Sequence, residues 1–102
     1  MYLVVFRNRK RADIDAAQYA ADAQDMEKLA RSQAGYRAFK SYTSEDGEVV
    51  AISEWDDEAS ARAWGKQAEH MLVQGRGRAE YYEEYTLFGA NEPRVHQFKR
   101  DT

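Results

Sequence analysis

Two β-type runs flank a tight turn in the middle of the chain. They are 36-YRAFKSYT-43 and 48-EVVAISEW-55, joined by 44-SEDG-47. Their β-branched and aromatic residues favour extended strands. The Asp-Gly pair in the joining segment is typical of a tight turn between antiparallel strands. The sequence therefore predicts a β-hairpin, and the elements on either side must be arranged around it.

The hairpin is preceded by a strand and a helix. The run 2-YLVVF-6 predicts a short strand, and the segment from about residue 13 to 33 predicts a helix. Residues at helical spacing give this helix one apolar face: Ala16, Tyr19, Ala23, Met26 and Ala30. Asp13 or Asp15 is suited to cap its start, and Gly35 to end it in a left-handed conformation.

A second helix and a last strand follow the hairpin. Asp56 and Asp57 can cap a helix over 58-EASARAWGKQ-67, whose Ala61, Trp64 and Ala68 share a face. The glycines at 65, 75 and 77 argue against one long straight helix. The tyrosines, Thr86, Leu87 and Phe88 of 81-YYEEYTLF-88 favour a strand.

The order strand, helix, strand, strand, helix, strand is that of a ferredoxin-like α+β sandwich, βαββαβ. We expect one domain over residues 1–90 and a polar tail over 91–102. Both helices of this topology cover the same face of the sheet, yet 2-YLVVF-6 and 49-VVAI-52 are apolar on both faces. Because exposed apolar patches of this size mark interfaces, the sequence predicts a homodimer that packs sheet to sheet.

Composition excludes several classes of function. A net charge of -3 with interspersed signs gives no basic face for nucleic acid. The chain has no cysteine and two histidines, which excludes thiolate chemistry and argues against a resident metal. Its N-terminal apolar run is too short to span a membrane and lacks the charge order of a signal peptide, so we expect a cytoplasmic protein.

The middle of the chain also carries a family resemblance. The segment 35-GYRAFKSYTSEDGEVVAISEWDDEASARAW-64, followed by 69-EH-70, 77-GR-78 and 81-YYEEY-85, resembles the antibiotic biosynthesis monooxygenase superfamily. The resemblance extends over roughly residues 1–88 and implies a dimeric α/β barrel. It also implies a pocket between the sheet and the two helices of each protomer. Cofactor-independent members oxidise an electron-rich phenol or anthrone with dioxygen.

That chemistry requires a base and oxyanion donors, because the substrate must become an anion before it gives an electron to oxygen. We expect His70 to be the base or proton relay, since its ordinary pKa lies near 6.5. Asn8 and Arg78 are the expected polar anchors. For each there is a structural alternative: His70 bonds a neighbouring carbonyl or Glu69, Asn8 ends a strand, and Arg78 pairs with a nearby glutamate.

Aromatic residues complete the expected site. Trp64 would form an aromatic wall, with Phe6, Tyr36 and Tyr82 as further substrate-binding residues; the alternative is that they only pack in the core. The basic run 7-RNRKR-11 either attracts an anionic substrate or is a solvated strand end.

The sequence thus predicts a small monooxygenase that acts without a cofactor on an aromatic or quinol-type molecule, with dioxygen as the second substrate. The alternatives are a haem-binding, haem-degrading enzyme and a non-catalytic ligand-binding barrel. In haem-degrading relatives the iron-ligating histidine follows the tryptophan by about ten residues. That position is Gln74 here, and His70 comes about one helical turn earlier.

Overall fold

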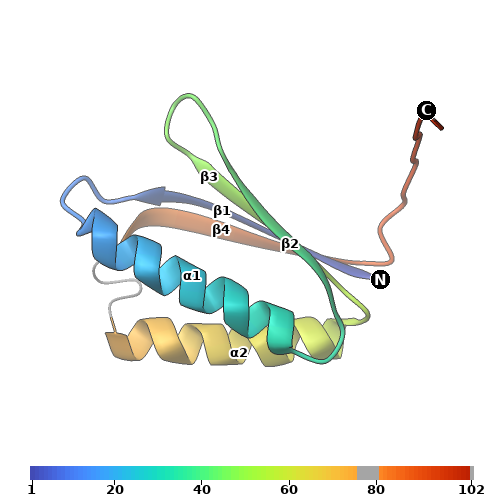
Figure 1. The fold of residues 1–102 in the computed structure, drawn as a ribbon, viewed down its shortest axis with the longest axis horizontal. Helices are drawn as coiled ribbons and strands as arrows, with labels where there is room; N and C mark the ends of the chain where they lie inside the picture. Colours follow the sequence, from blue (N-terminus) through green and yellow to red (C-terminus); the bar gives the residue numbers. More distant parts are fainter. Residues whose placement is uncertain (76–80, 102) are drawn as a thin grey trace.

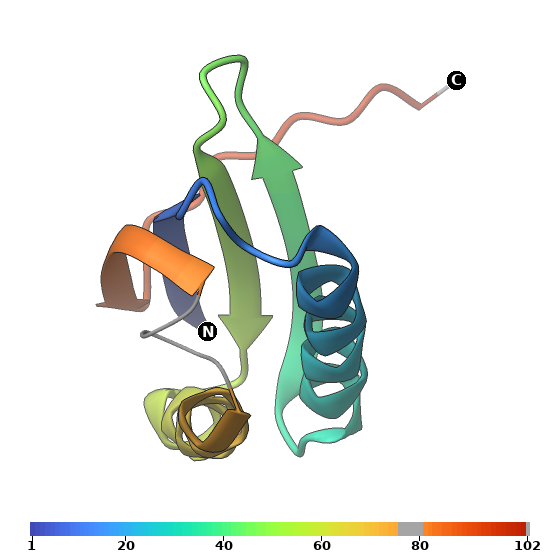
Figure 2. The ribbon, with the colours of Figure 1, turned by 90° about the vertical axis from the view of Figure 1, so that its left-hand side faces the viewer.

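The computed structural model describes the fold of residues 1–75 and 81–101, with side chains described for 1–67 and 81–101. Its elements are β1 (Tyr2–Lys10), α1 (Ala16–Ser32), β2 (Tyr36–Thr43), β3 (Val49–Trp55), α2 (Glu58–Gly75) and β4 (Tyr82–Asn91). The strands form one antiparallel sheet in the order β2-β3-β1-β4, which Figure 2 shows with α1 beside β2. Both helices lie on one side of this sheet (Figure 1). The predicted ferredoxin-like α+β fold is therefore confirmed.

Local signals fix where the helices begin. The Asp15 Oδ1 atom accepts the N–H of Gln18 at 3.1 Å, and the Asp57 Oδ1 atom accepts that of Ser60 at 2.8 Å. Each bond satisfies a backbone donor that has no partner within its own helix. After α1 the chain reverses at Gly35, whose φ is 83°. The predicted caps Asp15 and Asp57 and the left-handed Gly35 are confirmed.

The prediction that glycines interrupt the second helix is wrong. The helix α2 runs without interruption through Gly65 to Gly75. A glycine inside a helix costs only about 1 kcal/mol relative to alanine, and packing of one helix face readily outweighs that cost. Here Ala61 is buried in the core and Trp64 packs against it.

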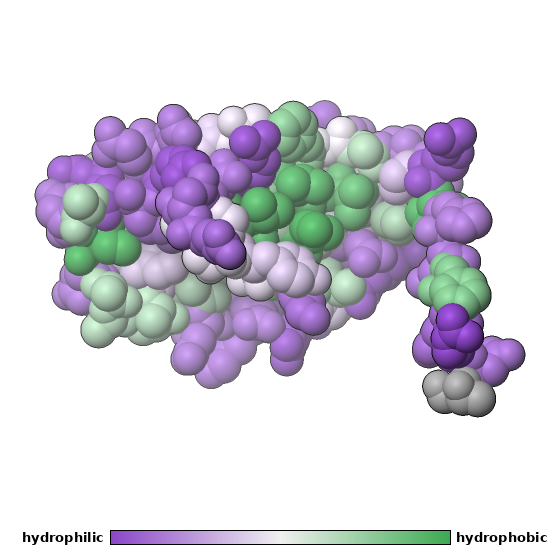
Figure 3. All heavy atoms as spheres, turned by 90° about the horizontal axis from the view of Figure 1, so that it is seen from above, coloured by the Kyte–Doolittle hydropathy of each residue, from purple (hydrophilic) through white to green (hydrophobic). Residues whose placement is uncertain are grey.

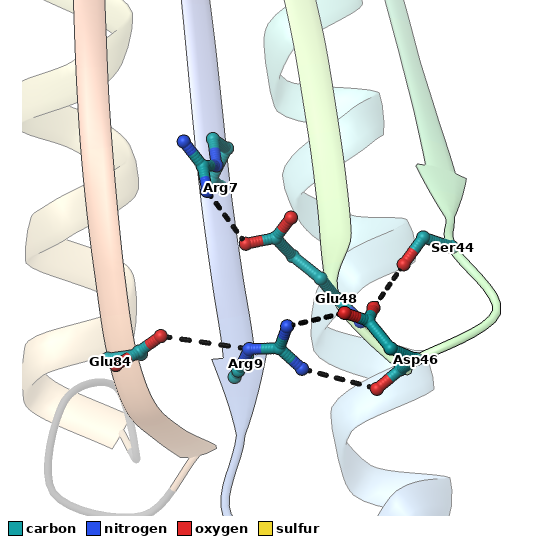
Figure 4. A network of polar contacts seen from close by, with 6 residues as sticks. All are labelled: Arg7, Arg9, Ser44, Asp46, Glu48 and Glu84. Atoms are coloured by element: carbon teal, nitrogen blue, oxygen red, sulfur yellow. Dashed lines mark hydrogen bonds and ion pairs between the residues drawn. The ribbon is translucent and has the colours of Figure 1, made fainter.

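The first strand is also longer than its apolar run. Arg7 and Arg9 continue β1 with their side chains on the face away from the helices (Figure 4). The Arg7 guanidinium lies 3.3 Å from Glu48, and that of Arg9 lies 2.7 Å from Asp46 and 3.7 Å from Glu84. Hydrogen bonds from Ser44 and Arg9 hold the pKa of Asp46 well below its usual range. The basic run 7–11 is therefore divided between the two faces of the sheet.

The core lies where β1 and β3 meet the helices. Val4, Ala30, Trp55 and Ala61 are buried there, with Trp55 fully enclosed. The Trp55 indole N–H donates to Ser53 Oγ at 3.0 Å, so that this buried polar pair is satisfied.

The opposite side of the sheet is apolar at its centre, where hydrophobic residues gather in Figure 3. We call this surface the open face. Its apolar residues are Leu3, Val5, Tyr42, Val50, Ile52 and Phe88. Tyr42 is 52% exposed and Phe88 48% exposed, so no element among the described residues covers them. The prediction that these strands are apolar on both faces is confirmed, while the dimer that would cover the open face stays a prediction.

The chain after β4 leaves the sheet. Residues 93–101 have no regular secondary structure and extend away from the body (Figure 1). Their apolar side chains, Val95 and Phe98, are 64% and 76% exposed. Neither α1 nor α2 is long and apolar enough to cross a membrane.

Candidate functional site

A cavity of about 380 Å³ lies between the sheet and the two helices. This volume is within the range of sites that bind small organic molecules. Most of its wall is apolar, contributed by Val4, Phe6, Ala23, Met26, Phe39, Val49, Ala51, Trp64 and Leu87. Its uncharged polar groups include Asn8, Tyr19, Ser41, Ser53, Tyr82 and Tyr85, and its carboxylates are Asp22 and Glu27.

The cavity reaches the surface beside the edge strand β4. Tyr85 and Leu87 line it, yet they are 41% and 60% exposed. Both face the helix side of the sheet, because they pair with Asn8 and Phe6 of β1. Tyr85 and Leu87 are therefore reached by solvent on the side of the sheet that the cavity occupies.

An irregularity in β4 brings two tyrosines to the same wall. Asn8 pairs with Tyr85, whereas Lys10 pairs with Tyr82, so β4 carries one residue more than β1 between these pairs. Regular alternation would place residues three apart on opposite faces, and the bulge removes this constraint. The rings of Tyr82 and Tyr85 consequently lie 5.8 Å apart, and each lies within 5.6 Å of the Phe6 ring.

Asn8 provides an amide at this aromatic wall. Its side chain is buried, with 3% of the residue exposed, and it lines the cavity. The Lys10 ammonium donates to the Asn8 Oδ1 atom at 2.5 Å. The lysine also lies over the rings of Tyr19 and Tyr82, at 4.5 and 5.9 Å from their centroids. Burial lowers the pKa of Lys10 to about 8.

Tyrosine hydroxyls form two further hydrogen bonds around the cavity. Tyr19 and Tyr82 share a side-chain hydrogen bond, and burial raises the pKa of both phenols. The Tyr81 hydroxyl donates to the Asp22 Oδ2 atom, while Gln18 Nε2 donates to Asp22 Oδ1 at 3.1 Å. The Asp22 carboxylate, which lines the cavity, thus has both of its oxygens hydrogen-bonded.

Trp64 places an indole donor in the wall. Its ring stacks on that of Trp55 with centroids 5.4 Å apart and packs edge-on against Phe39. The Trp64 Nε1 atom is buried. Among the buried side-chain nitrogen and oxygen atoms of the described residues, it alone has no hydrogen-bond partner. An unpaired buried donor of this kind costs about 1–3 kcal/mol.

The structure brings four of the predicted site residues together. Asn8, Phe6, Trp64 and Tyr82 all line the cavity. Tyr36 lies elsewhere, with its ring edge-on to Trp55 at 5.9 Å. His70 belongs to α2, but its side chain lies outside the described residues, as does the whole of Arg78.

Sequence reasoning missed Asp22, and it considered Lys10 only as part of the basic run 7–11. The alternation of β1 was a usable signal for Lys10, because it places residues 8 and 10 on the same face. Asp22 follows Gln18 and Tyr19 by four and three residues, which puts all three on adjoining helix positions. The contact between Asp22 and Tyr81 joins positions 59 residues apart, and no local pattern predicts it.

Taken together, these groups suit an aromatic ligand that carries oxygen. The apolar and aromatic walls match a flat ring system, and the Asn8 amide matches an acceptor oxygen. No cluster of three or more histidine, cysteine or acidic side chains able to hold a metal ion occurs within the described residues.

Comparison with known proteins is consistent with this fold. The sequence model of the family described as antibiotic biosynthesis monooxygenase matches residues 1–75. The uncharacterized protein YqjZ of Bacillus subtilis is 30% identical over 101 residues, which cover 99% of this chain and 87% of the relative.

Two solved structures illustrate the shared fold. One, described as an antibiotic biosynthesis monooxygenase, superposes with a TM-score of 0.75 at 15% identity and covers 92% of this chain and 100% of its own. The other is SnoaB, a cofactor-independent oxygenase from Streptomyces nogalater, with a TM-score of 0.66 at 19% identity. It covers 90% of this chain and 94% of its own.

Proposed function

Because the chain belongs to the antibiotic biosynthesis monooxygenase family, we propose that it is a small monooxygenase that works without a cofactor. Its substrates would be dioxygen and an aromatic or quinol-type small molecule. The observation that carries this proposal is the cavity of about 380 Å³, with aromatic walls and the buried Asn8 amide in its lining. The fold shared with SnoaB, a cofactor-independent oxygenase, supports it.

An anthrone-type phenol illustrates the balance of the reaction. Removal of a proton gives an electron-rich anion, which transfers one electron to dioxygen. Recombination of the two radicals forms a carbon–oxygen bond, and protonation gives a hydroperoxide. Loss of water then leaves a carbonyl, so that one oxygen atom enters the product and the other leaves as water. All four electrons come from the substrate, and no external reductant is needed.

The cavity residues supply the requirements of the first step. We assign Asn8 as a donor to the substrate oxygen on which negative charge develops, and Trp64 as part of the aromatic wall. Phe6 and Tyr82 form the wall against which the aromatic rings pack. His70 stays the predicted base and Arg78 a predicted anchor. Asp22 is a second candidate for the base, since its carboxylate lines the cavity.

Oxygen uptake with dithranol, a dihydroxyanthrone, tests the proposal. The assay runs in buffer treated with a chelator, and the rate without protein is subtracted. We expect uptake of one dioxygen per dithranol, with a rate reduced roughly tenfold or more in Asn8→Ala, as for loss of an oxyanion donor. Arg62→Ala is the matched control, because Arg62 lies on α2 with its side chain 74% exposed. Uptake equal to the blank, or equal in Asn8→Ala and the control, would contradict the proposal.

We also propose that the protein acts as a homodimer. A second copy packed on the open face would cover Phe88, which is 48% exposed, together with the partly buried Val5 and Ile52. Two copies of the same sheet would then enclose a barrel with the helices outside, as the family resemblance implies.

A haem-binding enzyme is the second candidate function. Haem requires an axial ligand, and the position that supplies it in haem-degrading relatives is Gln74 here. Titration with haemin, followed at the Soret band, separates the two candidates. A saturable shift at one haem per chain that is lost in His70→Ala would favour haem binding, and no shift would remove it. Binding of aromatic molecules without oxygen uptake would instead favour a non-catalytic ligand-binding protein.

A further inference from the structure

Lys10 is half-buried beside Asn8 and is not itself a lining residue of the cavity. It follows Asn8 by two residues on β1, on the same face of the sheet. Its Nζ atom lies 4.5 Å from the centroid of the Tyr19 ring, contributed by α1, and 5.9 Å from that of Tyr82, contributed by β4. Lys10 therefore influences the cavity through the groups it touches.

The hydrogen bond between Lys10 and Asn8 can have only one direction. An ammonium group donates hydrogen bonds and accepts none, so the Asn8 atom at 2.5 Å from Nζ must be the amide oxygen. The amide NH₂ group then points away from the lysine. None of the hydrogen bonds found among the described residues uses this nitrogen, although Asn8 is 97% buried by residue area, with 3% exposed.

No carboxylate among the described residues forms an ion pair with Lys10. The groups facing it from neighbouring elements are the phenols of Tyr19 and Tyr82, whose pKa values are raised by burial. Both phenols are therefore neutral at physiological pH. Nearby on α1, Asp22 is hydrogen-bonded to Tyr81 and Gln18. The Asn8 oxygen is thus the strongest acceptor recorded for the ammonium.

We propose that Lys10 is a positioning residue that holds the Asn8 amide with its NH₂ group toward the cavity, so that the site selects aromatic ligands presenting an acceptor oxygen. A carbonyl or phenolate oxygen satisfies this donor, whereas an unsubstituted hydrocarbon ring does not. This inference extends the proposed function. It rests on that function in one respect, namely that the cavity is the site where the ligand binds.

Nitrogen–proton NMR of the Asn8 side chain tests the positioning role without any ligand. With Lys10 titrating at a pKa of about 8, the Asn8 NH₂ resonances should shift with a midpoint near that pH. The transition should be absent in Lys10→Met and in Lys10→Gln, and also in Lys10→Arg, whose guanidinium keeps its charge. Lys40→Met is the matched control, since Lys40 also lies over a tyrosine, Tyr42 at 5.6 Å, but on the open face. In Lys40→Met the Asn8 transition should persist.

A matched pair of ligands tests the selection. Tetralone and tetralin differ by one carbonyl oxygen, and neither titrates. At neutral pH the unaltered protein should bind tetralone roughly fivefold more tightly than tetralin, the ratio that one hydrogen bond gives. Lys10→Met should reduce this ratio to about two or less while changing tetralin binding little. Lys10→Arg and Lys40→Met should retain it.

The outcomes separate the two claims. An Asn8 transition that is unchanged in Lys10→Met and Lys10→Gln, or a tetralone preference that survives in both, would overturn the role of Lys10. A Lys10-dependent Asn8 transition in a protein that binds neither ligand would support the positioning role and overturn the proposed function. Loss of the transition and of the preference together would support both.

Discussion

The indole rings of Trp55 and Trp64 stack at 5.4 Å with an angle of 29° between their planes, yet their N–H groups differ. Trp55 donates to Ser53 at 3.0 Å, whereas Trp64 Nε1 is buried without a partner among the described atoms. The first tryptophan therefore completes the core with its N–H satisfied, and the second lines the cavity with its N–H unpaired.

Substitution of the two tryptophans by phenylalanine should have different effects. Trp55→Phe leaves a void and an unpaired Ser53, so the free energy of unfolding should fall by about 2 kcal/mol or more. Trp64→Phe removes a donor with no partner, and its stability loss should be under about 1 kcal/mol. Urea unfolding measures both. Equal losses would contradict the distinction.

Gly65→Ala should stabilise the protein. A methyl group added at Gly65 meets no atom within 4 Å. Alanine in a helix interior is favoured over glycine by about 1 kcal/mol, which corresponds to a rise in Tm of about 4–8 °C for a domain of this size. Calorimetry checks the rise. Gly35→Ala should act in the opposite direction, because a φ of 83° is strained for alanine and the added carbon would overlap Ser60. A lower Tm for Gly65→Ala would contradict the open space beside it.

Stability should depend on pH through Lys10. Its pKa is about 8 in the folded protein and 10.5 ordinarily, so between these values the unfolded chain holds a proton that the folded chain has lost. The free energy of unfolding should therefore rise with pH across this window, by roughly 1–3 kcal/mol relative to Lys10→Met. Urea unfolding at pH values from 7 to 10 gives the comparison. Parallel profiles for the two proteins would show that burial does not perturb Lys10.

The open face should mediate self-association. Ile52→Lys places a charge at its centre and should convert a dimer into a monomer, because an unpaired charge is costly to bury in an interface. Light scattering during size-exclusion chromatography measures the mass. Val95→Lys is the control, since Val95 lies in the tail and is 64% exposed. A monomeric parent protein at micromolar concentration would contradict the homodimer.

The base can be identified by comparing two variants. If Asp22 removes the substrate proton, Asp22→Asn should reduce dithranol turnover by about a hundredfold or more, and His70→Ala should reduce it far less. If His70 is the base, the order is reversed. Unfolding free energies measured in parallel separate lost chemistry from lost structure. Full turnover by both variants would exclude both assignments.

Most of the fold was predictable because its signals are local. The Asp46-Gly47 turn, the caps Asp15 and Asp57 and the alternation of β1 each depend on a few neighbouring residues. The continuation of α2 through Gly65 was not predictable in this way. It depends on the packing of Ala61 and Trp64 against the core, which outweighs the low helix propensity of glycine.

The site was predictable only in part. Alternation placed Asn8 on the inward face with Phe6, as the structure shows. The approach of Tyr82 to Tyr85 depends on a bulge, and the bond between Asp22 and Tyr81 joins distant segments. Both are tertiary relationships that composition and spacing do not encode.

The central claim is that the protein oxidises an aromatic substrate bound in this cavity, with dioxygen as the oxidant. Labelling with oxygen-18 gas tests it most directly, with the dithranol product analysed by mass spectrometry after short incubation. The account predicts that the quinone formed by the protein carries one labelled oxygen atom, and that its yield falls to the blank in a variant combining Asn8→Ala and Trp64→Phe. An unlabelled product, or a labelled yield that this variant leaves unchanged, would contradict it.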